Sequence, residues 1–389
     1  MGKKLLSAML LIVLCFSLVA CGESKETGGD QTEPKTEDTA DKPDDTTKEA
    51  EKEPAGEDVD KANIKIGVAM PTKDLQRWNQ DGANMKRRLE AAGYEVDLQF
   101  ANNEIATQLS QVENMVTGGC DVLVIASIDG SSLGTVLDKA ADADIPVVAY
   151  DRLLMESDAV SYYATFDNFM VGVIQGEFIR DKLDLDNSEG PYNIELFTGS
   201  PDDNNARFFF GGAMEVLQPY IDEGKLVVTS GQQKFEEVAT LNWSTEEAQK
   251  RMENLITAYY AGDTKLDAVL SSNDSVANGI TNALLGAGYK AENFPILTGQ
   301  DCDITSVKNI INGTQSMSIF KDTRTLAAQV VEMVNAIVEG KEVPVNDTET
   351  YDNGTGIIPT FLCEPVFADI NNYKELLIDS GYYTEDQLQ

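Results

Sequence analysis

The chain has 389 residues, a formal net charge of −36 and no histidine. A surface this acidic repels phosphate backbones and anionic lipid headgroups, which argues against nucleic-acid binding. The lack of histidine excludes Ser-His-Asp and Cys-His catalysis and imidazole metal sites, and leaves open hydrolytic chemistry that rests on paired carboxylates.

Residues 1–20 predict a signal peptide. Lys3 and Lys4 precede an apolar stretch, Leu5 to Val19, that is too short for a normal membrane-spanning helix. The stretch ends in Leu18-Val19-Ala20-Cys21-Gly22, which resembles the lipobox of bacterial lipoproteins. That resemblance implies cleavage before Cys21 and a diacylglyceryl anchor on its sulfur. The alternative is an ordinary signal peptide with an incidental cysteine.

The next stretch predicts a disordered acidic linker over residues 21–62, with the lipidated cysteine at its start. From Gly22 to Lys61 the chain is Glu, Asp, Lys, Thr and Pro with almost no large apolar residue. Such a segment buries too little surface to offset its ordering entropy. We therefore expect an extracytoplasmic protein that is lipid-anchored to the cell membrane and held off it by a flexible tether.

Apolar runs rich in β-formers then alternate with amphipathic helical stretches. The first series is a strand at 64–70, a helix through Arg87 and Leu89, a strand at 95–100, a helix through Ile105 and Met115, a strand at 122–126, a helix through Leu133 and Val136, a strand at 146–150 and a short strand at 161–164. Such alternation is typical of βαβ units around a parallel sheet that is buried on both faces.

A second series of similar layout begins near Phe166. It contains a helix through Val173 and Phe178, a strand at 192–197, a helix through Met214 and Leu217, strands at 225–230, 268–271 and 295–298, and helices at 245–260 and through Ile280 and Leu284. A strand at 313–320, a helix at 323–338 and an extended stretch at 356–367 follow. This is more chain than one core holds comfortably, so we expect two lobes.

We expect an α/β fold of two Rossmann-like lobes, each a parallel sheet flanked by helices, joined by a hinge of several strands. The N-terminal lobe is predicted at 63–165 plus 301–318, and the C-terminal lobe at 166–300 plus 319–355. Residues 356–389 are predicted as a tail near the hinge. A cleft between lobes is a usual place for a small-molecule site, and a hinge permits closure around a ligand.

Five strand-like runs each stop at a cluster of hydrogen-bonding side chains. The clusters are Gln76-Arg77-Trp78, Tyr150-Asp151-Arg152, Asp203-Asn204-Asn205, Ser272-Asn273-Asp274 and Gln300-Asp301. In open parallel sheets the ligand crevice lies outside the carboxyl ends of the strands. The clusters therefore predict one site, suited to a ligand with many hydroxyl groups.

Residues 64 to about 366 resemble the type I periplasmic sugar-binding proteins, and most of all their xylose-binding and multiple-sugar-binding branch. The segments that carry the resemblance are Leu75-Gln76-Arg77-Trp78, Ala149-Tyr150-Asp151-Arg152, Gly199-Ser200-Pro201-Asp202-Asp203-Asn204-Asn205-Ala206, Ser272-Asn273-Asp274, Gly299-Gln300-Asp301 and Gly313-Thr314-Gln315. The resemblance implies a monomeric receptor that delivers a monosaccharide to the transmembrane subunits of an ABC permease. Some members of the family also report the sugar to a membrane sensor with a role in chemotaxis. Xylose is the first expected ligand, followed by glucose and galactose.

The chemistry of a sugar selects the candidate ligand residues. Each hydroxyl both donates and accepts hydrogen bonds, so planar Asp, Asn and Arg side chains can hold two neighbouring hydroxyls. An aromatic ring covers the C–H face of a pyranose. The candidates are Arg77, Trp78, Asp151, Arg152, Asn205, Trp243, Asn273 and Asp301. The family resemblance adds Lys321, just beyond the strand that ends at Phe320.

Each candidate also has a plainer interpretation. Asp and Asn often cap helices that follow strands, and Arg often pairs with them on a surface. Capping explains one or two clusters, but not five at one sheet edge. The tryptophans could be ordinary core residues, and Lys321 could be a solvated lysine.

We expect no cofactor and no metal. Beyond Cys15 and Cys21 the cysteines are Cys120, Cys302 and Cys363, an odd and widely spaced set. We interpret these three as free buried thiols rather than a disulfide with one cysteine left over.

Three rival functions are weighed against the sugar receptor. A secreted glycosidase would use two of the carboxylates as acid and nucleophile, but their pairing with arginine keeps them ionised, which favours binding, and we expect no enzyme activity. A DNA-binding regulator of the same fold would need a helix-turn-helix, and no such motif precedes Ile64 in this sequence. A receptor for nucleosides or amino acids would show two facing aromatics or a carboxylate clamp, and neither pattern is evident.

Overall fold

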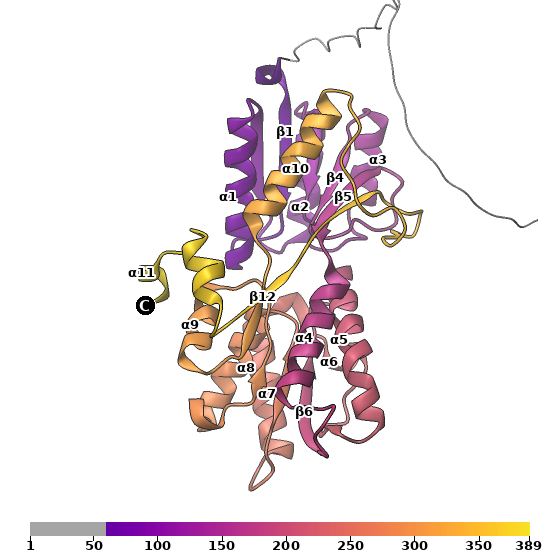
Figure 1. Ribbon diagram of the computed structural model, residues 1–389. Coiled ribbons are helices and arrows are strands. Elements are labelled where there is room, and N and C mark those ends of the chain that lie inside the picture. Colours follow the sequence, from indigo (N-terminus) through magenta and orange to yellow (C-terminus); the bar gives the residue numbers. More distant parts are fainter. Residues whose placement is uncertain (1–59) are drawn as a thin grey trace, which may run out of the picture. The chain divides into compact units, whose positions relative to one another are not determined.

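The computed structural model describes residues 60–389, and these fold into two α/β lobes (Figure 1). The predicted signal peptide, the anchor at Cys21 and nearly all of the predicted linker lie outside the described residues. The last linker residues do not: a short 3₁₀ helix, η1 (Lys61–Asn63), precedes the first strand. The Lys61 ammonium fixes it by donating to Asn335 Oδ1 at 2.7 Å and pairing with Glu339 at 2.9 Å.

The N-terminal lobe contains a six-stranded parallel sheet in the order β11-β5-β4-β3-β1-β2. Its strands are β1 (Lys65–Met70), β2 (Glu95–Phe100), β3 (Val122–Ile125), β4 (Val147–Tyr150), β5 (Val160–Phe166) and β11 (Thr360–Cys363). Its helices are α1 (Gln76–Ala91), α2 (Ile105–Thr117), α3 (Gly134–Asp142) and α10 (Thr323–Val338).

Successive residues of a strand point to opposite faces of the sheet, and the cores of this lobe follow that period. Ile66, Val68 and Met70 of β1 pack with residues of α1 and α10 on one face. Ala69 packs with residues of α2 and α3 on the other face. Both faces are thus covered, as the continuous apolar character of the strands predicted.

The C-terminal lobe contains a four-stranded parallel sheet in the order β7-β6-β8-β9. Its strands are β6 (Tyr192–Phe197), β7 (Leu226–Val228), β8 (Ala268–Ser271) and β9 (Ile296–Leu297). Its helices are α4 (Asn168–Lys182), α5 (Asn204–Asp222), α6 (Phe235–Val238), α7 (Thr245–Tyr259), α8 (Asp274–Gly286) and α9 (Ile304–Asn312), with the 3₁₀ turns η2 (Leu241–Trp243) and η3 (Ala291–Asn293). A parallel bridge between Gln300 and Ile319 links this sheet to β10 (Met317–Phe320), which pairs antiparallel with β12 (Val366–Asp369).

Helices α4 and α5 cross at very close range because each has a glycine at the contact. A Cβ on Gly172 would lie 2.0 Å from the carbonyl oxygen of Phe209. Only glycine permits that approach of two backbones. The crossing fixes the start of α5. Asn204 and Asn205, two residues of a predicted site cluster, lie there.

The chain passes between the lobes three times: from β5 to α4, from β10 to α10, and from β11 to β12. The predicted fold class, two parallel-sheet lobes with a hinge of several strands, is therefore confirmed. After β12 the chain forms one π-helical turn, η4 (Lys374–Asp379), and ends in α11 (Glu385–Leu388).

The packing reverses the predicted lobe assignment of two segments. The stretch 301–318, predicted in the N-terminal lobe, contributes α9 and the first two residues of β10, and Met317 packs with Val269 of β8 in the core of the C-terminal lobe. Helix α10, predicted in the C-terminal lobe, packs against α1 and places Leu326 and Val330 in the core of the N-terminal lobe. The crossing falls between them, at 321–322, and periodicity alone does not show which sheet a strand or helix joins.

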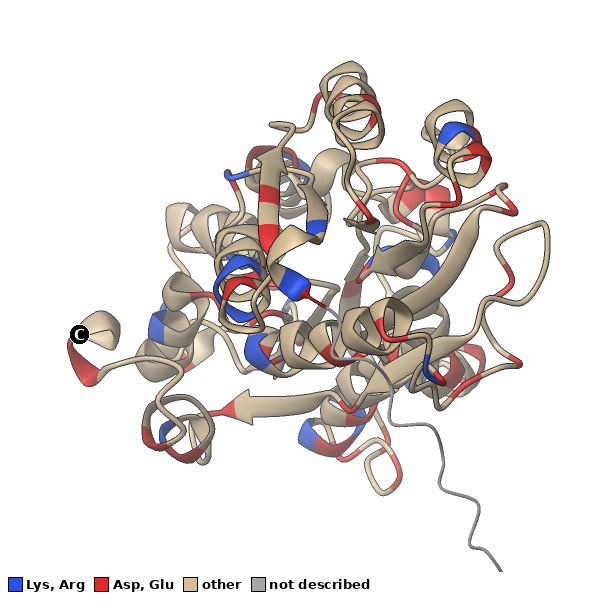
Figure 2. Cartoon of the chain, turned by 90° about the horizontal axis from the view of Figure 1, so that it is seen from above, with Lys and Arg blue, Asp and Glu red and all other residues tan. Residues whose placement is uncertain are grey.

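Asp and Glu residues, red in Figure 2, are spread over helices, strands and loops of the folded part. None of the helices within residues 60–389 is both long and apolar enough to cross a membrane. The prediction of free thiols is confirmed, because Cys120, Cys302 and Cys363 are buried and unbonded to one another.

Candidate functional site

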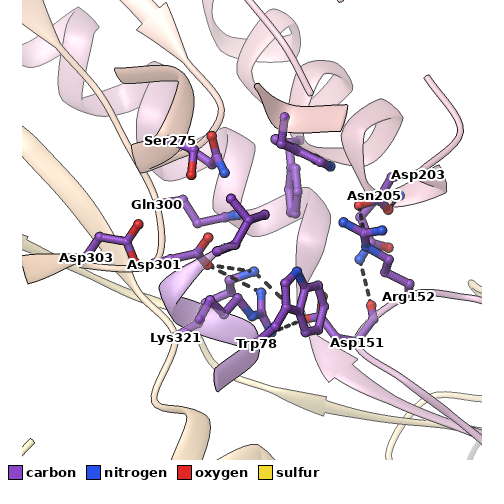
Figure 3. Close-up of a pocket in the computed structure, with 15 residues that line it drawn as sticks. Trp78, Asp151, Arg152, Asp203, Asn205, Ser275, Gln300, Asp301, Asp303 and Lys321 are labelled. Atoms are coloured by element: carbon purple, nitrogen blue, oxygen red, sulfur yellow. Dashed lines mark hydrogen bonds and ion pairs between the residues drawn. The ribbon is translucent and has the colours of Figure 1, made fainter. Parts of the chain in front are cut away.

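All nine predicted ligand residues line one pocket between the lobes. The wall is formed by Leu75, Arg77, Trp78, Asp151, Arg152, Asp203, Asn205, Phe209, Trp243, Asn273, Ser275, Gln300, Asp301, Asp303 and Lys321. Most of these residues follow the carboxyl ends of strands or stand at the start of the next helices, so the topology brings them together (Figure 3). Phe209, within α5, and Trp243, in η2, reach the pocket from other positions.

A ring of alternating charges forms one side of the pocket. The Arg77 guanidinium, at the start of α1, pairs with Asp151 of the same lobe and lies 3.3 Å from Asp301 of the C-terminal lobe. The Lys321 ammonium closes the ring, 3.3 Å from Asp301 and 3.8 Å from Asp151. Lys321 is 2% exposed, so the solvated-lysine interpretation is wrong.

A second buried carboxylate, Asp81, also binds Arg77, and the sequence analysis missed it. Asp81, one helical turn further along α1, accepts from Arg77 Nε at 2.9 Å and from the Tyr150 hydroxyl. Burial raises the pKa of Asp81 to about 6, although Arg77 opposes the shift. The sequence did carry a signal for this pair: Asp81 follows Arg77 by four residues, and side chains at i and i+4 meet on one face of a helix.

Asp151 is the hub of the pocket. Its backbone has φ +60°, a conformation that non-glycine residues seldom adopt. Its carbonyl oxygen accepts from Tyr163 Oη at 2.5 Å, from Thr165 Oγ1 at 3.0 Å and from Asn205 Nδ2 at 2.6 Å. Burial pushes the pKa of the carboxyl up, but Arg77, Lys321 and Arg152 outweigh burial and hold it below its usual value.

The Asn205 bond to Asp151 joins the two lobes directly, and a second pair does the same. Arg152 Nε lies 2.9 Å from Asp203 Oδ2, and its Nη1 donates to the carbonyls of Ser127 and Ile128. Burial raises the pKa of Asp203, with Arg152 acting against it. Asp203 also caps α5 by accepting from the Asn205 amide, so capping and a place in the pocket are compatible.

The two tryptophans sit on different lobes. The guanidinium carbons of Arg77 and Arg152 lie 4.9 and 5.1 Å from the centre of the Trp78 ring. Such cation–π contacts fix both arginines beside one aromatic surface.

Trp243 is held by its own backbone and by two neighbours. Its φ is +56°, its ring meets Phe209 edge to face at 6.2 Å, and a Cβ on Gly199 would lie 1.9 Å from a ring atom. Phe209 was missed because a phenylalanine within an amphipathic helix is indistinguishable from core.

Asn273 and Asp303 each precede a helix, but only the Asn273 side chain caps its helix. Asn273 Oδ1 accepts from the Val276 amide at 2.9 Å and so caps α8. Asp303 makes no such bond to α9. Instead its carboxyl lines the pocket, where burial and the nearby Asp301 raise its pKa to about 7.

Four buried polar atoms of pocket-lining residues have no hydrogen-bond partner in the protein: Arg152 Nε, Trp243 Nε1, Gln300 Oε1 and Asp303 Oδ1. Arg152 Nε still has Asp203 as an ion-pair partner. Of the other three atoms, one is a donor and two are oxygens. Buried polar groups are usually satisfied in folded proteins, so unpartnered atoms that gather at one cavity are available to a ligand there. Within residues 60–389 no group of three or more His, Cys, Asp or Glu side chains is arranged to hold a metal ion.

The lobes, the hinge and the polar pocket between them define a small-molecule binding protein of the two-lobe type. Residues 66–342 match the family model described as "Periplasmic binding protein domain". The chain is 56% identical to the multiple sugar-binding periplasmic receptor ChvE of Rhizobium radiobacter, over 83% of this chain and 92% of the relative. It is 38% identical to the D-xylose-binding periplasmic protein of Escherichia coli K12, over 84% and 92%.

Among solved structures it is similar to an ABC transporter solute-binding protein from Clostridium phytofermentans with bound β-D-glucose. The two share 68% sequence identity and superpose with a TM-score of 0.82, covering 84% of this chain and all of the other. The chain therefore belongs to the type I periplasmic sugar-binding proteins, the family that its motifs resemble.

Proposed function

We propose that this protein is an extracytoplasmic receptor that captures a monosaccharide in the pocket between its lobes and delivers it to an ABC permease. One observation carries the proposal: the wall offers a free donor at Trp243 and free oxygens at Gln300 and Asp303, beside a buried charge ring. Sugar hydroxyls both donate and accept, so one ligand class can satisfy all three atoms.

Several features support this receptor over an enzyme. A glycosidase needs an acid poised to donate a proton and a second carboxylate free to attack. Arg77 and Lys321 hold the pKa of Asp151 down, which keeps it a hydrogen-bond acceptor. The relatives named above are binding proteins by name, and the same role without catalysis is the proposal for this chain.

The proposed ligands are D-xylose, the first expectation from the sequence, and D-glucose, which the 68% identical protein holds. They are the same ring with and without a hydroxymethyl group, so one charge ring can serve both. We further propose that the protein is a monomer anchored to the membrane through a lipid on Cys21, with the permease recognising the closed form.

Calorimetric titration of the purified protein with D-xylose, D-glucose, D-galactose, L-arabinose and D-ribose tests the function. We expect one-to-one binding of at least one pyranose and recovery of the sugar unchanged. Failure of all five sugars to bind would refute the monosaccharide receptor, and a chemically altered sugar would establish an enzyme.

A further inference from the structure

The segment after β12, residues 370–389, folds back and contacts both lobes. In Figure 1 it is the yellow chain beside α9. Leu377, Tyr383 and Leu388 pack with Cys302 and Val307, so the segment rests on the C-terminal lobe.

Two neighbouring tyrosines of this segment reach across to the N-terminal lobe. Tyr383 Oη accepts from Gln76 Nε2 at 2.6 Å and donates to the Cys302 carbonyl at 2.9 Å. Tyr382 Oη donates to Gln80 Oε1 at 3.1 Å. Gln76 and Gln80 are one turn apart on α1 and present one face to the segment.

The side chain of Gln76 is bound at both ends to groups of the other lobe. Its Nε2 donates to Tyr383, and its Oε1 accepts from the Ile304 amide at the start of α9, at 3.2 Å. Gln76 immediately precedes Arg77 of the charge ring, yet none of Gln76, Tyr383 and Ile304 lines the pocket. These bonds therefore depend on how the lobes sit, and not on direct contact with a ligand.

We propose that the C-terminal segment is a clasp: Tyr383 and Gln76 tie α1 to α9 and favour the closed arrangement of the lobes, which sets affinity from outside the pocket. Rotation of one lobe about the three crossings changes the spacing of α1 and α9, and both bonds to Gln76 then break. A contact made only in the binding-competent form raises that form's population and the apparent affinity by the same factor. The affinity part rests on the proposed sugar-receptor function.

A clasp and a pocket contact differ in their dependence on the ligand. A pocket contact changes the affinity for different sugars by different factors, because it touches only some hydroxyls. A clasp changes the affinity for every sugar by one common factor, because the sugars share one closing step. Tyr383 and Gln76 act through the lobes and are thus positioning residues.

The variants for the test are Tyr383→Phe, Gln76→Ala and the double variant, with Tyr373→Phe as the matched control. Tyr383→Phe keeps the buried ring and loses only the hydroxyl. Tyr373 lies in the same segment and the same cluster, and its hydroxyl makes none of the clasp bonds. Two readouts are needed: the radius of gyration from X-ray scattering without added sugar, and the Kd for D-glucose and D-xylose.

We expect each single variant to enlarge the radius of gyration and to raise Kd about 3- to 10-fold, the worth of one hydrogen bond. The factor should be the same for both sugars, and saturating sugar should restore the wild-type radius. The double variant should be weaker than either single one, because Gln76 keeps its bond from the Ile304 amide in Tyr383→Phe and Tyr383 keeps its bond from Gln80 Nε2 in Gln76→Ala. Unchanged scattering, or a loss of affinity that differs between sugars, would overturn the clasp.

The scattering result separates this inference from the proposed function. If the wild-type protein binds neither sugar, the receptor proposal fails, while the radius of gyration still decides whether the clasp exists. A merely structural role for Tyr383 would lower the unfolding temperature and leave the scattering curve unchanged, which also counts against the clasp.

Discussion

Replacing Asp151 by asparagine removes the central negative charge of the pocket with almost no change in shape. Arg77 keeps Asp81 at 2.9 Å and Asp301 at 3.3 Å, and Lys321 keeps Asp301 at 3.3 Å. The free energy of unfolding should therefore fall by only ~1 to 3 kcal/mol, below the ~3 to 5 kcal/mol that follows when a buried charge loses its sole partner. Sugar binding should weaken by ~2 to 4 kcal/mol, because the ligand loses a charged acceptor and the cations lose their alignment.

Titration calorimetry at pH 7.5 measures the binding loss, which corresponds to about 30- to 1000-fold in Kd, and denaturant unfolding measures the stability. The matched control is Asp144→Asn in the same lobe, an exposed aspartate with φ +55° against +60° for Asp151. We expect the control to leave both quantities unchanged. Wild-type affinity in Asp151→Asn would show that this carboxylate is not part of the sugar site.

Three further predictions follow from the C-terminal side of the pocket. Trp243→Phe should weaken sugar binding by ~1 to 2 kcal/mol through loss of the indole donor and part of the ring; an indole fluorescence that ignores saturating sugar in the wild-type protein would contradict this. Gly199→Ala, whose Cβ would lie 1.9 Å from the indole, should raise Kd at least about tenfold by displacing the ring, whereas Gly134→Ala, which meets nothing within 4 Å, should bind normally. Because burial raises the pKa of Asp303 to about 7 from an ordinary 3.8, its stabilising effect is complete below pH 4 and lost as pH rises to about 7. Asp303→Asn should flatten the pH dependence of unfolding between these limits and add on the order of 2 kcal/mol at pH 8; an equally steep pH profile in the variant would assign the titration to another group.

The sequence predicted the pocket well because its logic is topological. Runs of apolar residues mark strands, and whatever follows their carboxyl ends in a parallel sheet must gather at one edge. Arg77, Asp151 and Asp301 could be placed together on that basis before any coordinates existed. Their roles in binding stay predictions until a ligand is titrated.

The failures have an equally physical cause. The strand β10 and the helix α10 are separated by two residues, and nothing in their periodicity tells that the chain changes lobe there. Asp303 was not among the candidates, since sequence does not show whether a carboxylate before a helix turns toward that helix or away from it. Tyr383 could not be connected with Gln76 because the contact joins the two ends of the folded part.

The three crossings also bear on the order in which the protein can fold. Strand β11 covers the flank of β5, and α10 fills one face of the same sheet, yet both come from the final quarter of the chain. Until they arrive, the first lobe has an open β-edge and a bare apolar face, features that promote aggregation. The N-terminal half should therefore be a poor candidate for expression on its own, and a chain cut before Thr360 should be captured by chaperones rather than accumulate as half of a receptor.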